Sequence, residues 1–277
     1  IEFDIDNNQK PIISIITPYY NSQKYIQETA NSILNQTFPY WEWIIIDDGS
    51  QEKEAKEKLI EIEQMDSRIK VLYKENGGTA AARDYGIEKS CEDSKYIMFL
   101  DSDDVIDKTY FECCYWTLET NPKASWAYTD TINFDGKEFL WRKWYNPDWE
   151  LDENILTVTS MVKKEDLQKV GGFGIHEKKV FEDWCLWLKL IRAQKFPVRI
   201  GSLLTWYRIK PLEESELKKS NSSNKKRAMK LVNEIKRDIV YKKPGVQYPK
   251  VDYNWEEILD EQPQIVNVKQ KENGKIN

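Results

Sequence analysis

The chain of 277 residues contains a single histidine, His176, and this scarcity excludes several kinds of active site. A serine or cysteine nucleophile activated by histidine would depend on that one residue, and no nucleophile-elbow sequence accompanies it. A metal site with several histidine ligands is impossible. A catalytic metal would need oxygen ligands, which magnesium and manganese prefer, and acid–base chemistry at neutral pH would depend on carboxylates.

Cysteine is scarce too, and its spacing argues against a zinc site. The four thiols include no Cys-x-x-Cys pair and no histidine neighbour; they are Cys91, Cys113, Cys114 and Cys185. We expect all four to be free, as in proteins of a reducing compartment.

Long apolar runs are absent. No stretch of about 18 apolar residues occurs, so no membrane-spanning helix is expected. Residues 1–10 are acidic and polar, unlike a signal peptide. Proteins that neutralise phosphate backbones carry positive charge, whereas this chain has a net charge of −6, so nucleic acid is not an expected partner.

The first hundred residues alternate between short β-branched runs and amphipathic patterns. Strands are predicted at 12–17, 43–46, 69–73 and 96–100. Helices are predicted between them, the first capped by Asn21 or Ser22 and the second by Ser50. The alternation predicts an α/β fold with a mostly parallel central sheet and helices on both faces.

From residue 109 onward the pattern is less regular. Helices are expected at 110–119 and 181–194, strands at 125–131 and 198–207, and an amphipathic helix at 225–241. The remaining tail has little to bury. The start at Ile1, without methionine, indicates a piece of a longer chain or a processed one.

Polar residues directly after the strands are the first candidates for a site, because ligands bind at the carboxyl ends of parallel strands. Tyr20 follows the first strand and could stack on a nucleobase, although turn chemistry explains the same residues. Asp47 and Asp48 follow the second strand. One of them could accept a hydrogen bond from a base, or both could belong to a plain turn.

The loop after the third strand carries Gly77 and Gly78, which would let a ligand approach the backbone closely. Arg83 lies about one turn into the following helix. Its guanidinium could pair with a phosphate or reach a base carbonyl, or it could simply be bonded to an aspartate.

The fourth strand ends in the segment Asp101-Ser102-Asp103-Asp104. Three carboxylates in four residues repel one another unless a cation is present. Two of them, spaced at i and i+2, could converge on one hard metal ion that in turn holds a diphosphate. A solvated acidic turn is the alternative, but a similar acidic pair at the end of a neighbouring strand favours the metal.

Glu182 and Asp183 open a helix that is otherwise largely tryptophan, leucine and phenylalanine. Carboxylates beside so much apolar surface are desolvated, which is the usual route to a general base. The positive end of the helix also favours acids, so a role limited to the helix terminus stays open.

Six segments in this order resemble the inverting family 2 glycosyltransferases of the GT-A fold. They are TPYYN (17–21), DDGS (47–50), NGGTAAARDYG (76–86), LDSDD (100–104), KVGGF (169–173) and FEDWCLWLKL (181–190). The resemblance implies a GT-A (Rossmann-like) domain at 11–210, with a nucleotide-binding half at 11–104 and an acceptor-binding half at 105–210. Residues 1–10 would be an N-terminal extension, and 211–277 a helical and extended C-terminal tail or linker.

The resemblance also implies a donor site for a nucleotide sugar, with a UDP or dTDP type favoured. The base pocket would be lined by Thr17, Pro18 and Tyr20, with Asp47 or Asp48 at the edge of the base. The rest of the nucleotide would be held by Gly77, Gly78, Arg83, Asp101 and Ser102.

For catalysis, the resemblance implies a single displacement. Asp183, with Glu182 as its neighbour, would take the proton of the acceptor hydroxyl. Asp103, with Asp101 as a second ligand, would hold Mn²⁺ or Mg²⁺ against the departing diphosphate. A glycan or glycolipid acceptor, a cytoplasmic or membrane-peripheral location, and further domains of a longer chain are the associated expectations.

Two residues depart from the family pattern. Many members have a histidine near the metal where this chain has Lys210, so metal affinity or dependence is in question. Cys185 replaces a common acidic residue. Among the tryptophans, Trp141 and Trp144 are candidates for stacking on acceptor sugars, whereas Trp184 and Trp187 are expected in the core; His176 is given no role.

Two other functions compete with this interpretation. A sugar-nucleotide pyrophosphorylase would need a glycine-rich basic loop directly after the first strand, and TPYYN stands there instead. A catalytically degenerate nucleotide-binding or scaffold domain of a larger glycan-assembly protein is the second alternative. Such a domain has no physical need for both Asp103 and Asp183.

Overall fold

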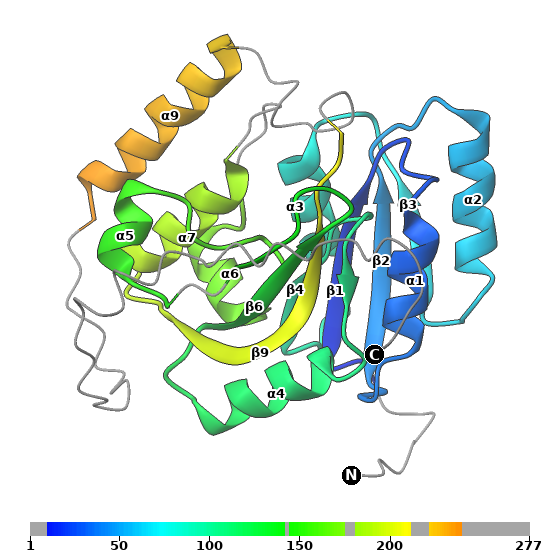
Figure 1. The fold of residues 1–277 in the computed structure, drawn as a ribbon, viewed down its shortest axis with the longest axis horizontal. Coiled ribbons are helices and arrows are strands. Elements are labelled where there is room, and N and C mark those ends of the chain that lie inside the picture. Colours follow the sequence, from blue (N-terminus) through cyan, green and yellow to red (C-terminus); the bar gives the residue numbers. More distant parts are fainter. Residues whose placement is uncertain (1–9, 142–143, 175–180, 212–221, 240–277) are drawn as a thin grey trace, which may run out of the picture.

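The structure, a computed structural model, describes residues 10–141, 144–174, 181–211 and 222–239 (Figure 1). His176 and the segments 1–9 and 240–277 lie outside these residues. All four cysteines are free, as predicted. Within the described part, no helix is long and apolar enough to cross a bilayer.

One half of the central sheet is parallel. Its strands, in spatial order, are β3 (Ile69–Tyr73), β2 (Trp41–Asp47), β1 (Ile13–Tyr19) and β4 (Tyr96–Phe99). β1, β2 and β4 are buried along almost their whole length, because helices cover both faces, and this burial explains their continuous apolar runs. The parallel α/β arrangement predicted from the alternating pattern is confirmed.

The other half of the sheet is mixed. It contains the two strands predicted at 125–131 and 198–207, whereas its three short strands have no clear sequence signal. β8 (Ser160–Lys163) runs antiparallel to both β4 and β6 (Trp126–Phe134), so it joins the two halves. β9 (Pro197–Arg208) is parallel to β6. Two short strands complete the sheet: β5 (Val105–Ile106) beside β9 and β7 (Phe139–Trp141) beside β6.

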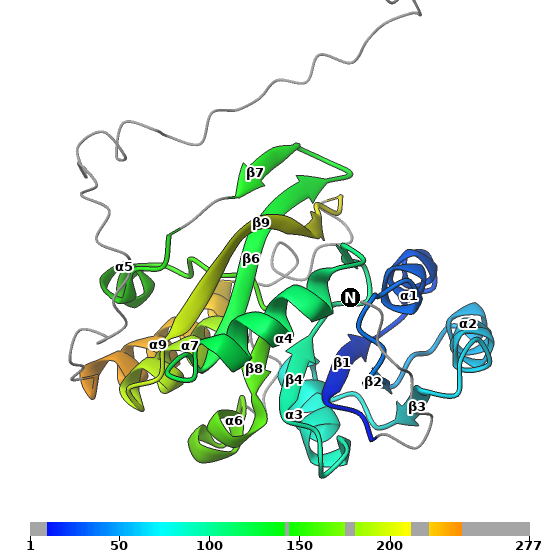
Figure 2. The same ribbon diagram turned by 90° about the horizontal axis from the view of Figure 1, so that it is seen from below.

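Helices cover both faces of this sheet (Figure 2). One face carries α1 (Ile26–Leu34), α2 (Lys53–Glu63) and α4 (Tyr110–Thr120). The other carries α3 (Thr79–Lys89), α6 (Lys164–Val170) and α7 (Glu182–Arg192), with the short α5 (Pro147–Asp152) packed on α7. Adjacent residues of one strand point to opposite faces. Ile15 packs in the core beneath α1, α2 and α4, called the first core, and Ile16 in the core beneath α3, α6 and α7, called the second core.

The predicted helix caps are wrong. α1 begins after Tyr25 and α2 after Glu52, and neither helix has a side-chain cap. Asn21 instead reaches from the end of β1 to the start of α2, where its Oδ1 accepts hydrogen bonds from the backbone nitrogens of Gln51 (3.0 Å) and Glu52 (3.3 Å). Ser50 Oγ accepts from the backbone nitrogen of Asn21 at 3.0 Å. These polar side chains bind the two strand-end loops to each other.

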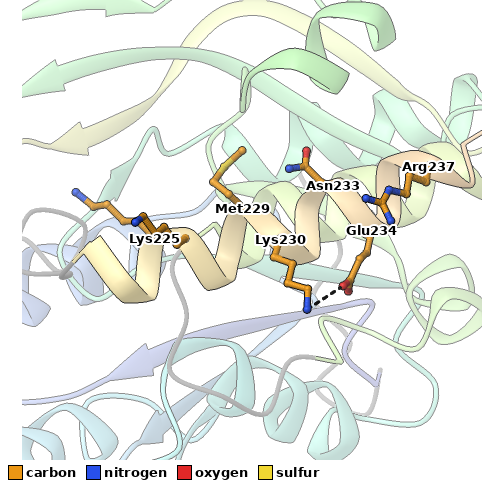
Figure 3. A pocket seen from close by; sticks show the side chains of 7 residues that line it. Lys225, Met229, Lys230, Asn233, Glu234 and Arg237 are labelled. Atoms are coloured by element: carbon orange, nitrogen blue, oxygen red, sulfur yellow. Dashed lines mark ion pairs between the residues drawn. The ribbon is translucent and has the colours of Figure 1, made fainter.

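α9 (Ser222–Arg237) follows the domain and packs on α7, burying Val232 and Ile235 in the second core. Its opposite side is basic: the helix carries six lysines and arginines and one glutamate. A groove of about 460 Å³ on this side is lined by residues between Lys225 and Arg237. Figure 3 shows their side chains along the helix, with Lys230 paired to Glu234.

Candidate active site

The predicted site residues gather where the parallel strands end. Tyr19 and Asp47 are register partners at the ends of β1 and β2. The backbone nitrogen of Leu100 donates to the carbonyl of Ile16, which places the acidic turn after β4 beside the end of β1. The strand-end segments 17–21, 47–50 and 100–104 therefore share one edge of the sheet.

Arg83 connects the acidic turn after β4 with the start of α7. Its two terminal nitrogens donate to Asp101 Oδ1 at 2.6 Å and to Glu182 Oε1 at 2.9 Å. The Arg83 side chain is only 2% exposed, so this bridge is shielded from water. Burial raises the pKa of Glu182, although the charge of Arg83 opposes that shift. A guanidinium thus joins residues 81 positions apart, one after β4 and one at the start of α7.

The turn at Gly171-Gly172-Phe173, which precedes α7 in the chain, is hydrogen-bonded to α3, the helix that carries Arg83. Asp84 accepts hydrogen bonds from the backbone nitrogens of Phe173 (2.7 Å) and Gly174 (2.8 Å). Gly172 has φ +55°, and a Cβ there would lie 2.4 Å from Asp84 Oδ1, so a side chain is excluded. The turn brings the Phe173 ring to 5.4 Å from the Arg83 guanidinium carbon. Two separate sequence motifs therefore form one structural unit.

Asp48 organises the glycine loop. Its Oδ1 accepts from Lys74 Nζ at 2.6 Å and from the backbone nitrogen of Gly77 at 2.8 Å, and its Oδ2 accepts from the backbone nitrogen of Gly78 at 2.7 Å. Gly78 has φ +90°, a conformation suited to glycine, and α3 starts after it. Asp47 instead accepts from the backbone nitrogen of Ser50 at 2.8 Å and shapes its own turn.

The residues after β1 differ in exposure. Thr17 is fully buried, and its hydroxyl accepts a hydrogen bond from the Trp43 indole at 2.8 Å. Pro18 is half-buried. Tyr20 is 45% exposed, so its ring presents a face that a base could stack on. Tyr20 is thus the residue of this segment with a surface available to a ligand.

The acidic turn is partly neutralised from within the chain. Lys210 Nζ lies 2.7 Å from Asp103 Oδ2. Burial raises the pKa of Asp103 despite this neighbouring charge, and burial raises that of Asp104 further. Asp104 Oδ1 accepts from the backbone nitrogen of Arg208 at 3.0 Å, and Arg208 Nε donates to the carbonyl of Asp103 at 2.8 Å. Ser102 is buried within the same turn.

A divalent metal at this turn would have few protein ligands. Asp101 and Asp103 supply carboxylate oxygens, but Arg83 pairs with the first and Lys210 with the second. Among the described residues, no three histidine, cysteine or acidic side chains are grouped as metal ligands. One or two carboxylates suit an ion that is also held by substrate phosphates. The residues therefore fit a metal bound jointly with a diphosphate, with Lys210 as a competing cation at Oδ2 of Asp103.

Asp183 is held at both of its carboxylate oxygens. Oδ2 accepts from Asn154 Nδ2 at 2.9 Å, and Oδ1 accepts from the backbone nitrogen of Trp184 at 2.8 Å. Burial raises the pKa of Asp183, and these two hydrogen bonds oppose the shift. The arrangement presents a fixed carboxylate with raised basicity, which is what general-base catalysis requires.

Sequence reasoning missed two neighbours of this carboxylate cluster. Asn154 lies in the irregular stretch before β8, where no periodic pattern marks it. Tyr207 is half-buried near the end of β9, and burial and the charges of Asp104 and Asp101 raise its pKa. The sequence analysis names Lys210, three residues further on, but only because it replaces a histidine common in the family.

The tryptophans separate as expected into core and surface. Trp184 and Trp187 are 5% and 0% exposed. Trp144 is 36% exposed, and the Arg199 guanidinium carbon lies 4.3 Å from its ring centroid; Trp141 is half-buried on β7. The α9 groove is lined by residues of that helix alone and includes no predicted site residue.

Comparison with known sequences agrees with this geometry. The model of the family described as "Glycosyl transferase family 2" matches residues 14–183. A Bacillus subtilis protein named as a teichuronic acid biosynthesis glycosyltransferase is 31% identical over 240 residues, which cover 84% of this chain and 90% of that protein. An uncharacterized glycosyltransferase of Haemophilus influenzae is 46% identical over 97 residues, or 35% of this chain and 38% of that protein.

Solved structures share the fold at lower sequence identity. Staphylococcus aureus TarS in complex with UDP-GlcNAc has a TM-score of 0.67 at 20% identity, covering 83% of this chain and 66% of that chain. The mannosyltransferase PcManGT from Pyrobaculum calidifontis, in complex with GDP-Man and Mn²⁺, has a TM-score of 0.57 at 16% identity, covering 73% and 58%.

Proposed function

The chain belongs to the family 2 glycosyltransferases, and on this basis we propose that it moves a sugar from a nucleoside diphosphate to an acceptor hydroxyl with inversion at the anomeric carbon. The observation that carries this proposal is the Arg83 bridge. It holds Asp101, on the donor side, next to Glu182, and so brings the neighbouring Asp183 to the edge of the donor site. The catalytic domain is proposed to span residues 11–210.

The proposed reaction is a single displacement with Asp183 as the base. The Asp183 carboxylate takes the proton of the acceptor hydroxyl, and the hydroxyl oxygen forms a bond to the anomeric carbon. The bond between that carbon and the diphosphate oxygen breaks, and its electron pair leaves with the diphosphate. Glu182 keeps Arg83 in place and contributes no proton transfer. Attack from the face opposite the diphosphate inverts the anomeric centre.

The donor is proposed to lie across the strand ends. Tyr20 stacks on the base, Thr17 and Pro18 shape the strand end beneath it, and Asp47 or Asp48 accepts from the base edge. Further contacts come from Gly77, Gly78, Arg83, Asp101 and Ser102. A UDP-type donor is favoured, a choice supported by the fold shared with TarS, which was solved with UDP-GlcNAc.

Mn²⁺ or Mg²⁺ is the proposed cofactor, held by Asp103 and Asp101 together with the donor phosphates. Such an ion supplies positive charge to the leaving diphosphate. Lys210 lies in the same place and carries a charge of the same sign. With Asp103 holding such an ion, the Lys210 ammonium would be placed to pair with the diphosphate oxygens.

The experiment that tests the donor site is thermal unfolding of the wild-type chain with UDP, GDP, dTDP and CDP, each with Mn²⁺ or with EDTA. A nucleotide at about 100 times its dissociation constant stabilises the fold by about 2.7 kcal/mol, which is several degrees for a domain of this size. We expect a shift for one nucleotide that is lost in Asp103→Asn. The absence of a shift with every nucleotide would contradict the donor site and favour the scaffold alternative.

The acceptor is proposed to be a glycan or glycolipid, used at a cytoplasmic membrane surface. The basic side of α9 supports this location, because Lys225, Lys226 and Arg237 form no ion pair with any described residue. Each such side chain contributes about 1 kcal/mol of attraction to an anionic bilayer. Changing all three to glutamine should lower the partition constant for phosphatidylglycerol vesicles, measured by sedimentation, about a hundredfold. The same change at Lys53, Lys56 and Lys58 of α2 is the matched control.

A further inference from the structure

Asn154 reaches the proposed base from a separate part of the chain. It lies between α5 and β8, and its Nδ2 donates to Asp183 Oδ2 at 2.9 Å. The segment that carries it is anchored to α7 a few residues earlier, where the Trp184 indole nitrogen donates to the carbonyl of Glu150 at 2.6 Å. Asn154 is therefore held in register with Asp183 by two contacts between α7 and the segment 150–154.

The orientation of the Asn154 amide is set by this one partner. Its Oδ1 is buried and accepts no hydrogen bond from any described residue. A buried acceptor left without a partner destabilises a fold, so such atoms are uncommon and call for an explanation. Donation from Nδ2 to an ionised carboxylate provides one, because an ionised carboxylate can only accept hydrogen bonds.

We propose that Asn154 is a positioning residue, which fixes the Asp183 carboxylate so that one oxygen faces the acceptor hydroxyl. This inference rests on the proposed role of Asp183 as the base. With Asn154 on Oδ2 and the Trp184 backbone on Oδ1, the carboxylate cannot rotate, and each oxygen still has a lone pair available for a proton. Placing the base within hydrogen-bond reach of its proton is the geometric condition for general-base catalysis.

Other charged groups also act on Asp183, and the test must separate them from Asn154. Arg83 on α3 favours the ionised form, and Asp101 after β4 disfavours it. Among the described residues, Glu182 on α7 and Tyr207 on β9 also interact with Asp183. None of these groups depends on Asn154 for a hydrogen bond, so changing Asn154 leaves their charges in place.

The experiment measures the pKa of Asp183 in the full chain by carboxyl-carbon NMR, with the signal assigned through its loss in Asp183→Asn. Asn154→Ala removes a donor to the charged form and should raise this pKa by about one unit. Asn154→Asp keeps the shape but places a second carboxylate nearby, so the pKa should also rise. Asp152→Asn, an exposed change on the same segment, is the matched control and should leave the pKa unchanged.

A second readout uses the donor that the nucleotide panel identifies. The acidic limb of the kcat/KM profile against pH should move upward with the pKa of Asp183, which lowers activity about tenfold on that limb. An unmoved pKa and an unmoved limb in both Asn154 variants would overturn the positioning role, even if activity falls at every pH. Full activity in Asp183→Asn would overturn the proposed base itself, and this inference with it.

Discussion

The ammonium nitrogen of Lys210 lies 2.7 Å from Oδ2 of Asp103, the carboxylate proposed to bind the metal. The Lys210 side chain is 24% exposed and that of Asp103 is 10% exposed, so the pair is shielded from solvent. The charges of Asp103 and Asp101 outweigh the burial that would lower the pKa of Lys210, and this pKa is raised, so the ammonium stays charged. A metal ion bound at Oδ2 of Asp103 would compete with this internal cation.

Lys210→Met should therefore increase the affinity for Mn²⁺ in the absence of nucleotide. Loss of the ion pair frees Asp103, and the expected gain is about tenfold, the equivalent of one charge-assisted hydrogen bond. Binding of UDP in EDTA should weaken by a similar factor, because the diphosphate loses a cation. Mn²⁺ titration followed by electron paramagnetic resonance measures the first effect, and calorimetry the second. Lys230→Met, at an exposed pair on α9, is the control. Equal Mn²⁺ affinities in the wild type, Lys210→Met and Lys230→Met would contradict a competition between Lys210 and Mn²⁺ for Asp103.

Arg83→Met should destabilise the fold and abolish the nucleotide-dependent thermal shift. The change leaves Asp101 and Glu182 facing each other without their shared cation, and breaking a buried ion pair in this way costs about 3–5 kcal/mol. Chemical denaturation measures the loss. Arg68→Met breaks the more exposed pair with Asp66 and should cost only about 1 kcal/mol. Adding Glu182→Gln to Arg83→Met should recover part of the stability, and no recovery would argue against the bridge.

Asp104→Asn should stabilise the protein increasingly as the pH rises. Burial and the charges of Asp103 and Asp101 raise the pKa of Asp104 well above that of an unfolded chain. The folded state therefore favours the protonated carboxyl, and stability is lost as the pH rises from about 4 through the folded pKa. Asparagine cannot ionise and avoids this loss. Melting temperatures at pH 4, 6 and 8 should diverge in favour of the variant, and a constant difference would contradict the assignment.

The strand-end carboxylates could be found from sequence because local patterns mark them. Apolar runs locate β1, β2 and β4, and the acidic residues that follow must lie at one sheet edge. Asn154 and β8 could not be found in this way, since a four-residue strand and a loop residue have no period of their own. The predicted helix caps were wrong for a related reason. Asn21 and Ser50 accept hydrogen bonds from backbone groups of a neighbouring loop, and such a tertiary contact cannot be predicted from local propensity.

Asp183→Asn should lower kcat by a factor of about 10²–10⁴, the usual contribution of a positioned base, while the thermal shift with nucleotide stays unchanged. Asparagine keeps the shape of the side chain and can still accept from the Trp184 backbone, so a loss confined to kcat identifies proton transfer. Glu182→Gln is the matched comparison. It weakens the contact with Arg83 and should act mainly on nucleotide binding, and therefore on KM. If Asp183→Asn and Glu182→Gln changed kcat by the same factor and KM by the same factor, these adjacent carboxylates would not have separate roles. Glu182 would then be the alternative base.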